Sequence, residues 1–184
     1  MSTSLRLNID DYEQMIANGA FVGIDRRLEF IHGEIREMSP AGPYHYDYIG
    51  FLTRWSTSNT TAGEVSVQIQ AVILLGDSLP EPDVMWLRPK RYGDQRPRAA
   101  DAMLIIEVAD SSLRYDLGEK SMLYAQAAIK EYWVVDIASQ VVHQLRQPTV
   151  DGYQDIRKFE RHESLSPTCK PDVALSLAEL FSEE

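Results

Sequence analysis

Two carboxylates stand at positions where charged side chains are unusual. Glu107 is the only charged residue of the apolar run 103–108, and Asp83 directly precedes a second apolar run, 84–87. Ionised carboxylates are rarely buried in strands unless they are paired or bind a cation. Lys120 follows Glu107 by 13 positions. Two acids at strand positions, with a lysine nearby, therefore indicate a metal site equipped for chemistry.

The chemistry that suits this pattern is phosphodiester hydrolysis. Mg²⁺ is usually bound through one or two carboxylates, with waters and substrate phosphates as its other ligands, and it neutralises a scissile phosphate and activates a water. Asp83 and Glu107 meet this requirement if their strands are neighbours and both acids lie at the same end. A lysine beside them stabilises the transition state or orients the water, which is the role we expect for Lys120.

Each of these residues also has a structural alternative. Asp83 follows Pro82 and could be a turn acid, and Glu107 could face outward from an edge strand. Lys120 could pair with Asp116 on a solvated helix face, a contact worth a few tenths of a kcal/mol. The ordered set of three residues is more specific than any one of them.

Hydrophobic periodicity and turn residues predict the elements that would position the site. Asn8 and Asp11 form a capping pair at the start of the first helix. Asp116, Lys120 and Tyr124 share one helix face at four-residue spacing. The expected elements are, in order, a helix 9–18, a hairpin 27–38 around His32-Gly33, a helix 44–59, strands 64–75, 83–87 and 102–109, a helix 116–128, strands 131–137, 141–146 and 153–159, and a short helix from 176.

This order predicts an α/β or α+β fold, in which helices flank a mixed sheet and residues 102–136 form one βαβ unit. The 184 residues contain no repeat, low-complexity tract or linker, so we expect a single domain over 1–184. No apolar run approaches the roughly 20 residues that span a bilayer. The N-terminal residues have no apolar signal core, so a cytoplasmic location is the default. The lone Cys169 excludes an intrachain disulfide.

The formal net charge of −10 argues mildly against nucleic acid as a partner, since phosphate binding requires Lys and Arg. A local cluster can override the total. Residues 88–98 hold five basic residues and one acid, Asp94. This basic strip is either a solvated loop or a surface that touches phosphates beside the site. Its members are Arg88, Lys90, Arg91, Arg96 and Arg98.

An ordered set of motifs extends well beyond the two acids. The motifs are Phe30-Ile-His-Gly-Glu-Ile, Met38-Ser-Pro, His45, Pro82-Asp83-Val, Leu104-Ile-Ile-Glu-Val, Ser111-Ser112, Tyr115-Asp116, Lys120 with Tyr124, and Glu131-Tyr-Trp-Val-Val-Asp136. Over residues 28–147 the chain thereby resembles a large bacterial family of restriction-endonuclease-like proteins in the PD-(D/E)XK nuclease superfamily.

The resemblance implies a restriction-endonuclease-like core, a mixed sheet between helices with an N-terminal helix and β-hairpin, and a divalent-metal site at one strand end. By position, Asp83 and Glu107 would bind Mg²⁺ or Mn²⁺, joined by the backbone carbonyl of Val108. Glu34 on the hairpin would complete the site through water. His45 matches a family position, with helix capping or packing as its alternative. The expected substrate-binding residues are His45, Arg88, Lys90, Arg91, Arg98 and Tyr124.

The sequence departs from the superfamily pattern at two positions. The superfamily lysine lies two residues after the second acid, where this chain has Ala109. Related proteins supply the lysine from the following helix, and Lys120 fits that variant. Asp110 adds a negative charge beside the site, either as a third ligand or, in the interpretation we favour, as the N-cap of the next helix.

The sequence thus predicts a Mg²⁺- or Mn²⁺-dependent DNA endonuclease with four catalytic residues, namely Asp83, Glu107, Lys120 and Glu34. One alternative is a catalytically inactive nuclease-fold module for binding or assembly, which the charge of −10 and Ala109 favour. Another is a hydrolase of small phosphoesters, because an acidic surface hinders duplex DNA more than small substrates. A homodimer is expected if both strands of a duplex are cut.

Overall fold

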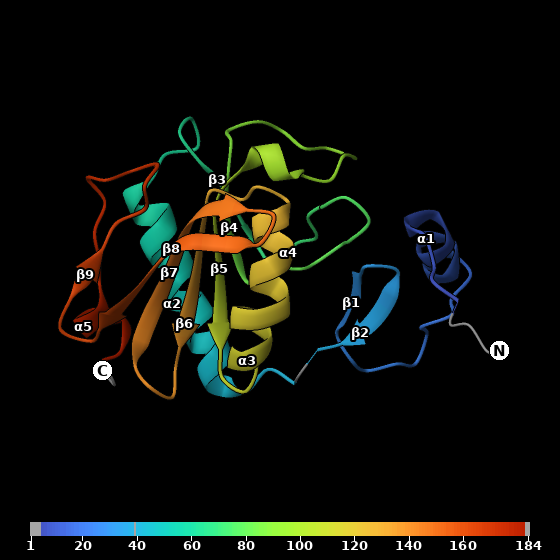
Figure 1. The fold of residues 1–184 in the computed structure, drawn as a ribbon, viewed down its shortest axis with the longest axis horizontal. Coiled ribbons are helices and arrows are strands. Elements are labelled where there is room, and N and C mark those ends of the chain that lie inside the picture. Colours follow the sequence, from blue (N-terminus) through green and yellow to red (C-terminus); the bar gives the residue numbers. More distant parts are fainter. Residues whose placement is uncertain (1–4, 39, 183–184) are drawn as a thin grey trace.

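A six-stranded mixed sheet forms the centre of the protein (Figure 1). The computed structural model describes residues 5–38 and 40–182, so Ser39 of the Met38-Ser-Pro motif and the first four N-terminal residues lie outside the described residues. Strands β5 and β6 are parallel and the other neighbours are antiparallel. In sheet order the strands are β3 (Ser66–Ile69), β4 (Val84–Leu87), β5 (Ala102–Ala109), β6 (Glu131–Asp136), β7 (Val141–Thr149) and β8 (Gly152–Glu160).

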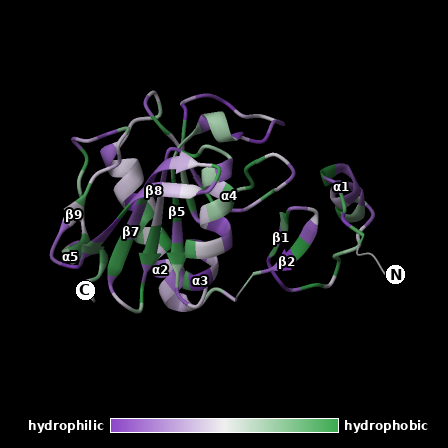
Figure 2. Cartoon of the chain, viewed as in Figure 1, coloured by the Kyte–Doolittle hydropathy of each residue, from purple (hydrophilic) through white to green (hydrophobic). Residues whose placement is uncertain are grey.

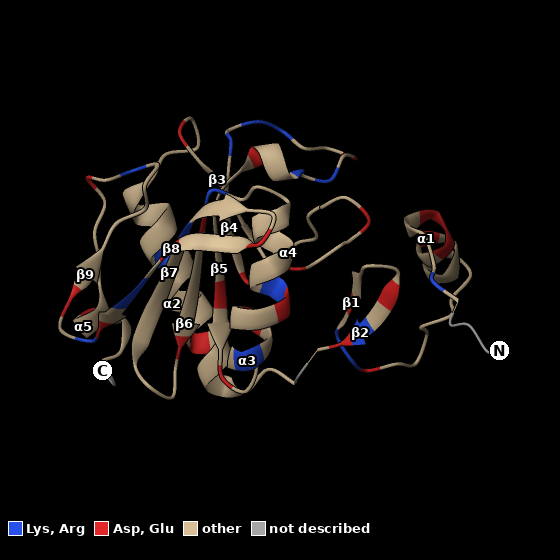
Figure 3. Cartoon of the chain, in the orientation of Figure 1, with Lys and Arg blue, Asp and Glu red and all other residues tan. Residues whose placement is uncertain are grey.

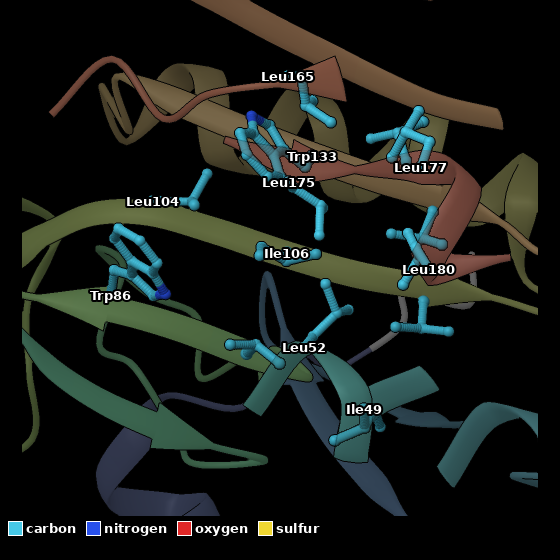
Figure 4. Packing of buried hydrophobic residues seen from close by; sticks show 14 of the residues in the cluster. Ile49, Leu52, Trp86, Leu104, Ile106, Trp133, Leu165, Leu175, Leu177 and Leu180 are labelled. Atoms are coloured by element: carbon cyan, nitrogen blue, oxygen red, sulfur yellow. The ribbon is translucent and has the colours of Figure 1, made fainter. Parts of the chain in front are cut away.

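Helices cover both faces of this sheet, so the predicted flanked mixed sheet and its βαβ unit are confirmed. Helix α2 (Pro43–Asn59) and the C-terminal segment with α5 (Leu177–Leu180) pack on one face, around Ile106 and the tryptophans Trp86 and Trp133 (Figure 4). The C-terminal segment also contains the short strands β9 (Ser164–Leu165) and β10 (Leu175–Ser176). Among the described residues, no helix is long and apolar enough to cross a membrane.

The opposite face is covered by the helix that connects β5 to β6. Its successive parts are α3 (Leu113–Tyr115), the π-helical turn η2 (Asp116–Lys120) and α4 (Ser121–Gln126). Leu123 and Tyr124 pack there against Ile105 and Tyr132. Strand β5 is mostly hydrophobic along its length (Figure 2), because both faces of the sheet are buried at this central strand.

The N-terminal part lies to one side of the sheet and consists of α1 (Ile9–Ala17) and the hairpin of β1 (Leu28–Ile31) and β2 (Glu34–Glu37) (Figure 1). The predicted capping box of Asn8 and Asp11 begins α1. His32 and Gly33 form the hairpin turn with φ angles of 50° and 77°, as a two-residue turn of this kind requires. Tyr12 and Phe30 form a small core with Leu79, which follows β3.

Several element boundaries and one helix cap differ from the predicted ones. The strand expected over 64–75 ends at Ile69, because Gln70 adopts a left-handed backbone with φ of 45°. The helix expected from 116 begins at Leu113 and contains a π-helical turn, a form that recurs at functional sites. The predicted N-cap at Asp110 is wrong, because two further residues separate it from the helix and Ser112 occupies the N-cap position.

Candidate active site

Asp83 and Glu107 lie side by side at the same end of neighbouring strands. In the antiparallel pair of β4 and β5, Val84 is opposite Ile106, so the residue before β4 is level with Glu107. The two residues are linked by reciprocal hydrogen bonds from the backbone to side chains. The Val108 N–H donates to Asp83 Oδ2 at 2.9 Å, and the Asp83 N–H donates to Glu107 Oε2 at 3.3 Å. Both carboxylates are buried.

Lys120 reaches this pair from the covering helix. Glu107 points to the same sheet face as Ile105, because side chains alternate along a strand, and this is the face that the helix covers. The Lys120 ammonium lies 2.9 Å from Glu107 Oε1 and 3.0 Å from Glu29 Oε1, and its residue is 1% exposed. The Tyr124 hydroxyl, one helical turn later, donates to Glu107 Oε1 at 2.7 Å. The predicted helix face is therefore turned toward the acids.

The neighbouring carboxylates keep Lys120 protonated, whereas burial and the nearby negative charges favour the protonated form of Glu107. Burial lowers the pKa of Lys120, but the carboxylates of Glu107 and Glu29 outweigh burial and raise it well above its usual range. Burial raises the pKa of Glu107 well above its usual range, and the negative charges of Asp83 and Asp116 add to this effect against Lys120. The single ammonium of Lys120 is thus surrounded by several carboxylates. The site therefore has more negatively charged than positively charged groups.

Asp83 is the acid whose ionised form the site supports best. Burial raises the pKa of Asp83, yet the hydrogen bond and charge of His45 and the Val108 N–H together hold it below its usual value. His45 Nε2 lies 3.2 Å from Asp83 Oδ2. The other ring nitrogen of His45, Nδ1, is buried and has no hydrogen-bond partner among the described residues. The first turn of α2 positions this ring.

The hairpin acid at the site is Glu29, and the sequence interpretation missed it. Glu29 is buried, pairs with Lys120 and accepts the backbone N–H of Glu81 at 2.8 Å. The predicted hairpin acid, Glu34, has a side chain that is 45% exposed and pairs with Arg36 at 2.9 Å, so the structure does not bring it to the other acids. An available signal was the position of Glu29 between the apolar Leu28 and Phe30-Ile31, the same pattern that marked Glu107.

The basic strip does not lie beside the acids, so of its two sequence interpretations the one that placed it on phosphates beside the site is not supported. Asp83 precedes β4 and Arg88 follows it, so they stand at opposite ends of the strand, and the basic loop lies at the top of Figure 3. Lys90 pairs there with Asp101 at 2.7 Å. The same loop carries the other predicted members, Arg91, Arg96 and Arg98.

Most of the acids at the site line a small cavity of about 30 Å³. Its volume is close to that of one water molecule in the liquid. Its cations are Arg27 and Lys120, and Ser111 and His45 also line it. Five carboxylates share the cavity, those of Glu81, Asp83, Glu107, Asp110 and Asp116. Asp110 therefore faces the acids, although it does not cap the helix.

The oxygens that the acids leave available fit a divalent cation. Among the described residues, the Asp83 carboxylate has two hydrogen-bond partners, His45 and the Val108 N–H, and both contact Oδ2. Its other oxygen, Oδ1, therefore has no hydrogen-bond donor in this part of the chain. Glu107 Oε2 accepts only the long bond of 3.3 Å. Within residues 5–38 and 40–182, no three His, Cys, Asp or Glu side chains are grouped as a metal site. A cation here would take waters or phosphates as further ligands, as Mg²⁺ usually does.

A larger cavity of about 810 Å³ lies at the other end of the sheet. It is lined by the first residues of β5 and β6, including Ala102 and Glu131. Neither Asp83 nor Glu107 reaches it. We place the candidate active site at the smaller cavity, because that is where the carboxylates and the buried lysine meet.

Fold and site together define a nuclease-like class of protein, a mixed sheet between helices with carboxylates at adjacent strand ends. A model of the Uma2 family, described as "putative restriction endonuclease", matches residues 9–178, and the chain belongs to this family. The resemblance noted in the sequence is thereby confirmed.

A crystal structure of "a putative nuclease belonging to DUF820" from Anabaena variabilis ATCC 29413 is similar in fold. The TM-score is 0.76 at 15% sequence identity, and the match covers 95% of this chain and 97% of that chain. At this identity the likeness concerns the fold alone. No curated protein sequence matches the chain.

Proposed function

We propose that this protein is a divalent-metal-dependent DNA endonuclease, with Asp83, Glu107 and Lys120 as its catalytic residues. The observation that carries the proposal is the contact of 2.9 Å between the buried ammonium of Lys120 and Glu107, beside Asp83. A buried lysine among carboxylates is costly to desolvate, so its presence in a cavity suggests a use in chemistry. Membership of the Uma2 family supports nuclease activity in general.

Asp83 and Glu107 would hold the cation, Mg²⁺ or Mn²⁺, together with the backbone carbonyl of Val108. When bound, the cation would neutralise charge on the scissile phosphate and lower the pKa of a water. The surplus negative charge of the site favours this ion, since the cavity has five carboxylates and two side chains of fixed positive charge. Burial and, after it, repulsion by the neighbouring acids raise the pKa of Glu107, and a divalent ion would offset both by stabilising the ionised carboxylate.

The other residues would hold these groups in position. His45 fixes the Asp83 carboxylate through a hydrogen bond to Oδ2, and this contact leaves Oδ1 available for the cation. Tyr124 fixes Glu107 through Oε1. Lys120 stays protonated between Glu107 and Glu29, so it can stabilise negative charge that develops on the phosphate without any change in its own protonation.

A non-catalytic nuclease-fold module is the second candidate. The observation in its favour is that Lys120 and Tyr124 already donate to Glu107 Oε1, so this oxygen is less available to a metal ion. Calorimetric titration with Mg²⁺ and Mn²⁺ separates the two candidates. Binding that Asp83→Asn weakens supports the endonuclease, and no binding at millimolar metal by the folded protein supports the module.

Incubation with supercoiled plasmid tests the activity. We expect conversion to nicked and linear DNA with Mg²⁺ or Mn²⁺, and none with a chelator. A homodimer that cuts both strands stays a prediction, which the molar mass in solution by light scattering would check. Intact plasmid under every metal condition would contradict the proposed function.

A further inference from the structure

The candidate active site is too small to enclose a nucleotide. A cavity of about 30 Å³ has room for one water or one ion, so a polynucleotide must lie across its mouth and present only the reacting phosphate. The residues on the surrounding surface therefore determine which kind of nucleic acid fits.

Two exposed tyrosines stand directly before and after His45, a residue that lines this cavity. Tyr44 is 72% exposed and Tyr46 is 54% exposed, and both lie in the first turn of α2. Between them in sequence, His45 is buried and contacts Asp83 at 3.2 Å. The ring of Tyr46 also meets the imidazole of His45 edge-on, with 5.9 Å between centroids. Tyr46 thus contacts the site through His45, and Tyr44 precedes His45 in the same helical turn.

Helix geometry sends the two rings to opposite sides of the site. Successive residues of an α-helix are rotated by about 100°. The side chain of His45 points toward Asp83. Those of Tyr44 and Tyr46 are therefore rotated about 100° from it around the helix axis, in opposite senses. Neither ring is needed for the core, since neither belongs to a buried cluster of the described residues.

The charges at the cavity give a phosphate backbone little to bind. Arg27 pairs with Glu81 at 3.1 Å, and Lys120 pairs with Glu107 and Glu29. Both cations that line the cavity are therefore already neutralised, and the net charge of the chain is −10. Apart from a metal ion at the reacting phosphate, binding of a polynucleotide here requires another source of affinity, and stacking of bases on aromatic rings supplies it independently of charge.

We infer that Tyr44 and Tyr46 are stacking platforms for unpaired bases on either side of the reacting phosphate, and that the substrate is single-stranded or locally melted DNA. The inference rests on the proposed nuclease function for the identity of the substrate. In a duplex the faces of the bases are covered by their neighbours, so the two rings have nothing to stack on until the strand opens.

Fluorescence anisotropy tests the inference with a labelled, phosphorothioate-linked oligothymidylate and the matching duplex, in Mg²⁺. Wild-type protein should bind the single strand more tightly than the duplex. The double variant Tyr44→Ala, Tyr46→Ala should lose about tenfold or more of the single-strand affinity, whereas Tyr44→Phe, Tyr46→Phe keeps its rings and should bind like wild type. Val150→Ala, at an apolar residue that is 74% exposed in the turn between β7 and β8, is the matched control.

Two results would overturn the inference, provided that circular dichroism shows every variant folded. One is equal single-strand affinity in wild type and the alanine variant, and the other is a wild-type preference for the duplex. The plasmid assay is separate. If binding depends on the rings but no DNA is cut, the stacking surface stands and the endonuclease proposal fails.

Discussion

Lys120 and Glu107 meet at 2.9 Å although the first lies on a helix and the second on a strand. The position two residues after Glu107 belongs to Ala109, which is buried on the same sheet face. Because the helix after β5 folds back over that face, its lysine arrives where a strand lysine would otherwise be. The two acids and the lysine predicted from the sequence are thus brought together in space, with the lysine on the helix rather than on the strand.

Replacement of Lys120 by methionine should abolish cleavage and destabilise the fold. The variant leaves the buried carboxylates of Glu107 and Glu29 without their cation, and loss of one partner of a buried ion pair costs about 3–5 kcal/mol. Urea unfolding measures the free energy, and plasmid nicking measures activity. Adding Glu29→Gln to Lys120→Met removes one of the unpaired charges and should restore part of the stability but none of the activity. A stable and active Lys120→Met would contradict the role of this residue.

The two hairpin acids should behave differently. Glu29→Gln removes one of the two carboxylates that hold Lys120, so we expect cleavage to fall about tenfold or more, as for other residues that position a ligand or catalytic group. Glu34→Gln changes an exposed side chain paired with Arg36, and activity should stay within about twofold, as for surface changes in general. Initial nicking rates under identical metal concentrations compare the two. A larger effect at Glu34 would restore the sequence interpretation.

The fold, and the meeting of Asp83, Glu107 and Lys120 at one candidate site, could be predicted from the sequence because both depend on local patterns. Glu107 stood out by being the only charge in an apolar strand, and the spacing of Lys120 and Tyr124 defined a helix face. Glu29 carried the same kind of signal, but side-chain alternation along a hairpin strand predicts that Glu29 faces outward if the apolar Phe30 faces inward. Both faces of β1 are in fact covered, which depends on packing against distant segments.

The basic strip was misplaced for a topological reason. Its position between the two acidic motifs in sequence suggested proximity, but a strand separates its first residue, Arg88, from Asp83. Antiparallel β4 and β5 bring together the start of one strand and the end of the other. A loop that connects the opposite ends is therefore held away from the acids, and sequence distance alone does not reveal this.

Charge reversal in the strip should leave cleavage unaffected. Because Arg91 and Arg98 lie in the loop between the far ends of β4 and β5, the double variant Arg91→Glu, Arg98→Glu should cut plasmid within about twofold of the wild-type rate at physiological salt, where charges beyond a Debye length are screened. Nicking rates at two salt concentrations measure this. A large loss of activity, greater at low salt, would mean that DNA reaches the strip.

Asp116 should make stability depend on pH. Burial raises the pKa of Asp116 above its ordinary value of 3.8, and the charges of Asp83 and Glu29 add to the shift against Lys120 and the Ser112 hydroxyl. The folded state therefore keeps a proton that the unfolded state has lost, so this contribution is full below 3.8 and disappears as pH rises through the folded pKa.

Asp116→Asn removes this titration and keeps an acceptor for Ser112. Relative to the wild type, the variant should gain stability as the pH rises above 3.8 through the folded pKa of Asp116, by about 1.4 kcal/mol for each unit of pKa difference. Urea unfolding of both proteins across this range is the measurement. A stability difference that does not change with pH, or that grows in favour of the wild type, would refute the expected shift.

Glu107→Gln tests the central claim most directly. The variant keeps the size and an acceptor oxygen of the buried side chain but removes its charge, so the protein should stay folded. Glu160→Gln makes the same change at an exposed acid of β8. Plasmid nicking in Mg²⁺ and Mn²⁺ should fall by about a hundredfold or more in Glu107→Gln and should match wild type in Glu160→Gln. Equal nicking by Glu107→Gln and wild type would contradict the assignment of this site.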